Sequence, residues 1–149
     1  MKTLLSSLFG IALSGILFSQ NCIEKHIGIY KVDLDRTIEQ IRENDPSKAN
    51  EEPPKKFLEM AQKASLELTE NKMSIINLGP QNPFDFVAKT SDKKGGSCDL
   101  ALNIPEETKL PEGVEIPTFT LYEKEDGRIH IQEGSKMSRI NDFIWRKIE

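Results

Sequence analysis

The fold of this chain is decided by residues 118–132, which read TFTLYEKEDGRIHIQ. Hydrophobic and polar residues alternate before Asp126-Gly127, and they alternate again after it. An Asp-Gly pair between two alternating runs is typical of a tight antiparallel hairpin, because such turns need residues that tolerate positive φ. The stretch therefore predicts two paired strands, over 116–122 and 128–132.

The same alternation continues outward from this hairpin in both directions. Turn-forming residues separate the runs at roughly 8- to 12-residue intervals, which is typical of a meander of short strands. The remaining expected strands are 24–32, 65–69, 73–78, 84–90, 97–104 and 143–148.

Two segments have helical spacing instead. Leu34, Ile38 and Ile41 share one helical face, and Asp33 or Asp35 can cap the start of that helix. Asn44-Asp45-Pro46 is expected to end it. A second helix is expected over 54–64, with Pro54 at its first turn.

Residues 45–56 between the two helices are polar and contain three prolines, so we expect a loop or flexible bridge there. The fold class is therefore α+β and mainly antiparallel β. We expect two short N-terminal helices followed by an up-and-down meander that forms a small barrel or a sandwich.

Three short motifs carry a resemblance to a known group of proteins. They are Gly28-Ile29-Tyr30, Asp33-Leu34-Asp35 and Leu66-Glu67-Leu68. In this order they resemble small exported bacterial lipoproteins with a lipocalin-like β-barrel. The resemblance implies a closed barrel, although the Gly-x-Trp strand expected in the middle of such a meander is absent, so barrel and sandwich both stay open.

The first 21 residues have the layout of an export signal. Met1-Lys2 is positive, and residues 3–18 are uncharged and rich in Leu, Ile and Phe. A stretch of about 16 uncharged residues is too short for a membrane-spanning helix, which needs roughly 20 apolar residues. We therefore expect a signal peptide over 1–21, a single β-rich domain over 22–149, and export from the cytoplasm.

Cys22 directly follows this signal, and its sulfur can be modified in two ways. It resembles the acylated cysteine of bacterial lipoproteins, with Ile23 to His26 as a short tether and a lipid anchor in the cell envelope. Alternatively, Cys22 and Cys98 form a disulfide in a secreted or periplasmic soluble protein. The preceding Ser19-Gln20-Asn21 fits neither the lipoprotein pattern nor the usual signal-peptidase pattern well.

Charge limits the partners of the protein. The net charge is −4 at pH 7, and Lys2 is the only charged residue before Cys22, so residues 22–149 carry −5. An acidic domain does not suit nucleic acid, and it offers no basic cluster to anionic lipid. Membrane attachment is therefore expected through an N-terminal lipid, and the other expected partner is an apolar ligand or an envelope protein.

Catalytic and metal-binding patterns were sought and not found in the sequence. It contains two histidines, His26 and His130, which we interpret as half-exposed strand residues rather than zinc ligands. Cys98 lies in an alternating run, which favours a buried thiol over a nucleophile. The Asp33 and Asp35 carboxylates are better explained as helix caps than as the first ligands of a calcium-binding loop. We therefore expect a protein that is not an enzyme and has no cofactor or metal.

Three aromatic residues, Tyr30, Phe119 and Trp145, could line a ligand cavity or simply fill the barrel. The sequence thus favours a membrane-anchored envelope lipoprotein with a binding or interaction domain. The alternative is a freely secreted ligand-binding barrel with a Cys22–Cys98 disulfide.

Overall fold

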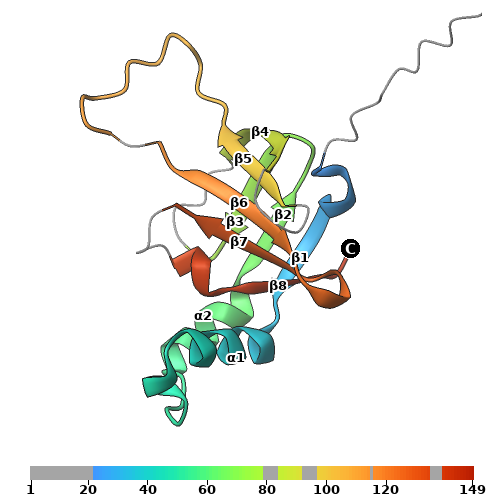
Figure 1. Cartoon of the computed structure of the whole chain (residues 1–149), viewed down its shortest axis with the longest axis vertical. Helices are drawn as coiled ribbons and strands as arrows, with labels where there is room; N and C mark the ends of the chain where they lie inside the picture. Colours follow the sequence, from blue (N-terminus) through green and yellow to red (C-terminus); the bar gives the residue numbers. More distant parts are fainter. Residues whose placement is uncertain (1–21, 79–83, 92–96, 115, 135–138) are drawn as a thin grey trace, which may run out of the picture.

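The computed structural model describes residues 22–78, 84–91, 97–114, 116–134 and 139–149, so the export signal expected over 1–21 lies outside it. Eight strands form a closed antiparallel barrel in which each strand pairs with its neighbours in chain order (Figure 1). They are β1 (Gly28–Val32), β2 (Ser65–Leu68), β3 (Lys72–Ile76), β4 (Phe84–Thr90), β5 (Cys98–Leu102), β6 (Thr118–Glu123), β7 (Ile129–Glu133) and β8 (Ile144–Lys147). The predicted meander is confirmed, and it closes as a barrel.

The Asp-Gly hairpin forms as expected. Leu121 of β6 lies opposite Ile131 of β7, and a short 3₁₀ turn, η3 (Glu125–Gly127), joins the two strands. Asp126 and Gly127 have φ values of 62° and 73°. These positive values explain why the turn needs an Asp-Gly pair, since β-branched and bulky residues avoid this conformation.

Closure depends on the first and last strands. Val32 of β1 lies opposite Trp145 of β8, and the Ile29 N–H donates to the Glu149 carbonyl at 3.0 Å. Gly28 has a φ of +150°, and a Cβ atom there would overlap that same carbonyl oxygen. A glycine is therefore required where the chain ends of the barrel meet.

The two helices, α1 (Leu34–Asn44) and α2 (Lys55–Lys63), lie between β1 and β2. The predicted order of one strand, two helices and then the rest of the meander is confirmed, so the helices do not precede the whole sheet. Asp33 caps α1 by accepting a hydrogen bond from the Arg36 N–H at 3.3 Å. The helix ends at Asn44, and the expected loop over 45–56 contains a 3₁₀ turn, η2 (Pro46–Lys48), and the first residues of α2.

The chain before β1 does not continue the strand. Glu24–His26 form a 3₁₀ helix, η1, in which His26 is 4% exposed, and the preceding Ile23 is 0% exposed. The predicted strand over 24–32 is therefore confirmed only over 28–32. Ile23–His26 pack on the barrel instead of forming the predicted tether. Burying Ile23 contributes roughly 2 kcal/mol, which outweighs the weak alternation of this segment.

The hydrophobic core fills the inside of the barrel, between the end near η1 and the end near α1. Since β1 joins η1 to α1, these two helical segments lie at opposite ends of that strand (Figure 1). A fourth 3₁₀ turn, η4 (Arg139–Asp142), precedes β8 and contacts α1. The largest fully buried side chains are Trp145, Tyr30, Phe143, Ile23, Leu66, Leu68, Met73, Leu100, Leu121, Ile129 and Ile131.

Candidate functional site

The N-terminal segment is fixed to the barrel by a disulfide between Cys22 and Cys98. Cys22 precedes η1, and Cys98 opens β5 and is fully buried, as expected from its alternating run. A disulfide sulfur cannot act as a nucleophile, and neither cysteine of this chain is a free thiol in the structure. The bond thus joins two parts of the chain that are 76 residues apart.

Polar contacts hold η1 in place beside the disulfide. The Tyr30 hydroxyl donates to the His26 carbonyl at 2.8 Å, and Lys25 forms an ion pair with Glu123 at the end of β6. Burial, together with the negative charge of Glu123, raises the pKa of Tyr30 to about 12. Tyr30 therefore stays neutral and serves as a hydrogen-bond donor at physiological pH.

The three aromatic residues expected at a cavity are part of the core. Tyr30 is 1% exposed, Phe119 5% and Trp145 0%. Trp145 packs on Phe143, with ring centroids 5.9 Å apart, and Phe143 stacks on Phe57 of α2 at 5.7 Å. None of the three expected residues lines the cavities described below, so they fill the barrel and do not form an open binding site.

A groove lies instead between the two helices, outside the barrel. We call it the interhelical groove, and it has a volume of about 380 Å³. Its lining combines apolar residues with a charged rim: Ile38, Ile41, Arg42, Asn44, Asp45, Lys48, Glu51, Glu52, Pro53, Pro54, Phe57 and Asp142. An adjoining cavity shares Pro54, Phe57 and Asp142 with it and extends it to Met60 and Phe143.

Most of the apolar groove residues are only half-buried. Ile38 and Ile41 of α1 and Phe57 and Met60 of α2 are all intermediate in exposure. Ile38 and Ile41 share the helical face predicted from their spacing. In the structure Thr37 is the buried residue of α1, and the two isoleucines line the groove.

Some of the charged side chains at the rim of the interhelical groove form ion pairs, and others do not. Lys48 forms an ion pair with Asp45 at 3.2 Å. Among the described residues, the Asp142 carboxylate has no hydrogen-bond or ion-pair partner. Although Asp142 is exposed as a residue, the surrounding protein partly desolvates its carboxyl group and raises its pKa, against the opposing effects of Lys48 and His130.

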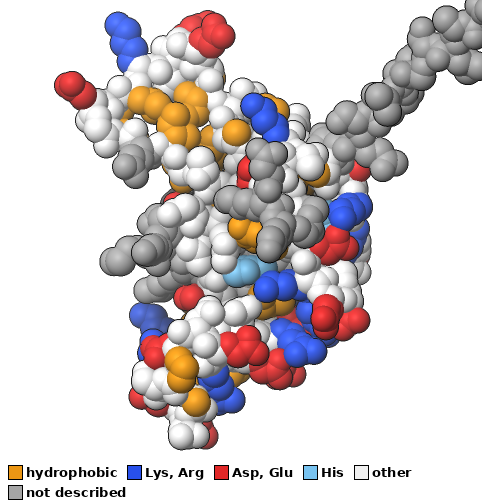
Figure 2. All heavy atoms as spheres, viewed as in Figure 1, with side chains coloured by type: hydrophobic (Ala, Val, Ile, Leu, Met, Phe, Trp, Pro, Cys, Tyr) orange, Lys and Arg blue, Asp and Glu red, His pale blue; other side chains and the backbone are white. Residues whose placement is uncertain are grey.

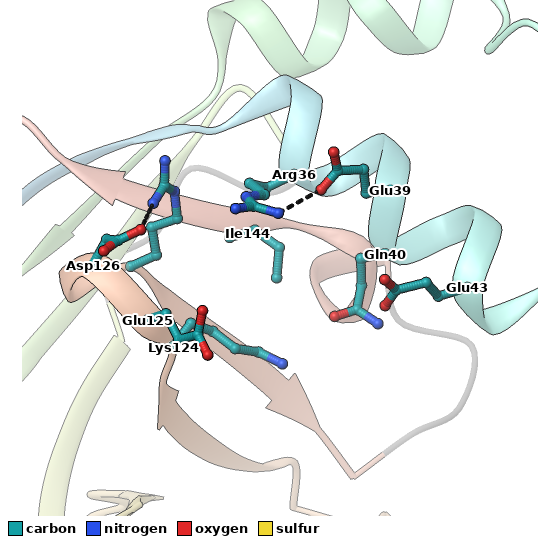
Figure 3. Close-up of a pocket in the computed structure, with 9 residues that line it drawn as sticks. Arg36, Glu39, Gln40, Glu43, Lys124, Glu125, Asp126 and Ile144 are labelled. Atoms are coloured by element: carbon teal, nitrogen blue, oxygen red, sulfur yellow. Dashed lines mark hydrogen bonds and ion pairs between the residues drawn. The ribbon is translucent and has the colours of Figure 1, made fainter.

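A second, polar cavity of about 240 Å³ lies between α1 and the β6–β7 turn (Figure 3). Arg36 pairs with Glu39 at 2.7 Å, and Arg128 pairs with Asp126 at 3.1 Å. Arg128 also donates from Nε to Asp33 at 2.7 Å. Of these contacts, the one between Arg128 and Asp33 joins β7 to the start of α1, so we interpret the cavity as part of a charged cluster between these two elements.

The two histidines are not the half-exposed strand residues that we expected. Each is 4% exposed, and His26 lies in η1 rather than in a strand. His130 of β7 donates from Nε2 to the Asn141 carbonyl at 2.7 Å, because a carbonyl oxygen can only accept. In the part of the chain that the structure describes, no three His, Cys, Asp or Glu side chains are grouped to hold a metal ion.

The connection between β5 and β6 is the most prominent surface feature. Residues 103–114 protrude from the barrel, and hydrophobic side chains gather on this connection (Figures 1 and 2). Leu110, Val114 and Ile116 are 40%, 51% and 45% exposed. No element was expected between the strands over 97–104 and 116–122, because no periodic pattern marks that stretch.

Within the described ranges, every helix is too short or too polar to cross a lipid bilayer. Comparisons with protein-family models, curated proteins and solved structures found no match to this chain.

Proposed function

We propose that this chain is an exported, non-catalytic binding protein whose N-terminal segment is fixed to a β-barrel by the Cys22–Cys98 disulfide. The disulfide is the observation that carries the proposal. Disulfides persist in oxidising compartments outside the cytosol. The uncharged, apolar sequence of residues 3–18 supports the same destination.

The packed barrel supports binding on the outside of the molecule. Tyr30, Phe119 and Trp145 occupy the interior with aromatic rings, whereas the interhelical groove is open and largely apolar. Its volume of about 380 Å³ lies within the range of small-molecule sites in proteins. The groove is therefore the best-supported binding site.

A second candidate function is a lipid-anchored envelope protein. It is favoured by the position of Cys22 directly after the uncharged segment. Two or more acyl chains would be needed, because a single chain anchors only marginally. Acylation and disulfide formation use the same Cys22 sulfur, so one molecule cannot have both, and an acylated chain would carry a free Cys98 thiol.

Intact mass of the mature protein, isolated from its native cells without reductant, distinguishes the two candidates. The proposal predicts a mass two hydrogens below that of the reduced chain, and reduction restores the difference. A large increment from acyl chains on Cys22 would instead establish the lipid-anchored candidate.

Two variants provide matched controls for this measurement. Under the proposal, Cys22→Ala and Cys98→Ala each abolish the two-hydrogen deficit, and neither variant incorporates labelled fatty acid. A fatty-acid label that survives in Cys98→Ala and disappears in Cys22→Ala contradicts the disulfide proposal.

A further inference from the structure

The interhelical groove joins an apolar surface to the Asp142 carboxylate, which has no hydrogen-bond or ion-pair partner among the residues that the structure describes. From this juxtaposition we infer that the groove binds a primary ammonium ion that carries an apolar chain. The inference rests on the proposed binding function and deepens it by naming the class of ligand. It is independent of how Cys22 is modified, since the groove lies at the helical end of β1 and η1 precedes that strand.

The apolar part of the ligand is specified by the groove walls. Ile38 and Ile41 form one wall, and Phe57 forms the other. Beyond Phe57 the adjoining cavity continues to Met60 and Phe143. A bound apolar chain removes the exposed apolar surface of Ile38, Ile41, Phe57 and Met60 from water, which favours binding. An extended alkyl chain matches a narrow groove of this composition.

The charged part of the ligand is specified by Asp142. Its carboxylate lies at the junction of the two cavities, because Asp142 lines both of them. The nearest competing cation, Lys48, is already held by Asp45. A partly desolvated carboxylate forms stronger charge-assisted hydrogen bonds than one in bulk water. An ammonium group at this junction can therefore donate to Asp142 while its chain lies along the groove.

More acidic than basic residues line the groove. Glu51 and Glu52 line it and have no ion-pair partner among the described residues. Arg42 lines the same groove and Lys56 lines the adjoining cavity, and these two cations are as exposed as the two glutamates. An anionic amphiphile could approach these two cations, and the experiment must therefore compare the two charge types directly.

Calorimetric titration of the purified, disulfide-bonded protein with three probes of equal chain length tests the inference. The probes are octylammonium, neutral octanol and octanoate. We expect octylammonium to bind about tenfold more tightly than octanol, the scale of one charge-assisted hydrogen bond, and octanoate to bind more weakly than both. Equal affinity for the three probes, tighter binding of octanoate, or no binding overturns the inference.

Intrinsic fluorescence locates the bound probe. Trp145 is the only tryptophan in the chain, and its ring packs on Phe143, which lines the adjoining cavity. Octylammonium is expected to change the Trp145 emission with the same affinity that calorimetry measures. A calorimetric signal without this fluorescence change places the probe elsewhere and overturns the assignment to the groove.

Three variants test which residues of the groove bind the ammonium group and which bind the alkyl chain. Asp142→Asn is expected to remove the tenfold preference for octylammonium over octanol and to leave octanol binding unchanged. Ile41→Ser is expected to weaken both probes. Glu67→Gln, which neutralises an exposed carboxylate on β2, serves as the matched control and is expected to change neither affinity. A preference that persists in Asp142→Asn overturns the role of this carboxylate.

Discussion

At the scale of single residues, His26 is the least satisfied polar side chain of the N-terminal segment. It is 4% exposed, and among the described residues its Nε2 atom has no hydrogen-bond partner. Burial and the nearby Lys25 charge lower its pKa below the usual value, and burial also lowers the pKa of His130. Both imidazoles are therefore held neutral in the folded protein.

Acidification is expected to destabilise the protein below about pH 6.5. The unfolded chain binds protons on both histidines from that pH downward, whereas the folded chain does so only at lower pH, so the free energy of unfolding falls as the pH falls. Each histidine contributes a slope of up to about 1.4 kcal/mol per pH unit. Urea unfolding at pH 7.5 and pH 5.5 measures the difference.

The variant His26→Met isolates one of the two contributions. It removes a buried imidazole that lacks a partner at Nε2 and is expected to reduce the pH dependence while keeping or raising stability at pH 7.5. If the free energy of unfolding of His26→Met falls between pH 7.5 and pH 5.5 by as much as that of the parent, the pKa of His26 is the same in the folded and unfolded chains.

At the scale of elements, Asp33 connects α1 to the β6–β7 hairpin. Its carboxylate caps α1 at the Arg36 N–H and also accepts from Arg128 at the start of β7. Burial alone would raise the pKa of Asp33, but the hydrogen bonds from Arg128 and from the Arg36 N–H outweigh it and lower the pKa. The stability from this contact is therefore present above about pH 4 and is lost as the pH falls through the lowered pKa.

Two substitutions at Asp33 separate the cap from the ion pair. Asp33→Ala removes both and is expected to lower the free energy of unfolding by about 2 to 4 kcal/mol. Asp33→Asn keeps a capping oxygen and is expected to cost about half as much. Urea unfolding at pH 7 measures both values. Equal costs for the two variants would mean that the charge contributes nothing beyond the cap.

The elements that could be predicted from sequence are those set by neighbouring residues. Asp126-Gly127 defines its hairpin locally, and Asp33 and Pro46 bracket α1. The interhelical groove could not be predicted, because it depends on how α1 and α2 lie against each other. For the same reason, the shared helical face of Ile38 and Ile41 did not indicate that these side chains would be half-buried at a groove.

At the scale of the whole molecule, closure and the disulfide are set by long-range contacts. The pairing of Val32 with Trp145 distinguishes a barrel from a sandwich, and no local pattern encodes a contact over that separation. The inward turn at Ile23 likewise depends on a core that forms elsewhere in the chain. Cysteine spacing allowed the Cys22–Cys98 bond without requiring it.

Removing the disulfide is expected to loosen the whole domain. The double variant Cys22→Ser/Cys98→Ser releases a loop closed over a separation of 76 residues and is expected to lower the free energy of unfolding by about 2 to 5 kcal/mol. Urea unfolding of the oxidised parent and the variant measures the change, and the reduced parent provides the control. A variant as stable as the oxidised parent would contradict a structural role for the bond.

The pairing of β1 with β8 also has a consequence for the order of events during biosynthesis. The ribosome makes Trp145 more than 110 residues after Val32, so the barrel cannot close until β8 has emerged. A chain that cannot complete its fold early remains threadable through a membrane pore. If the chain is exported as proposed, translocation then precedes folding, and Cys22 and Cys98, which both lie before β8 in the chain, reach the oxidising side before the barrel can close.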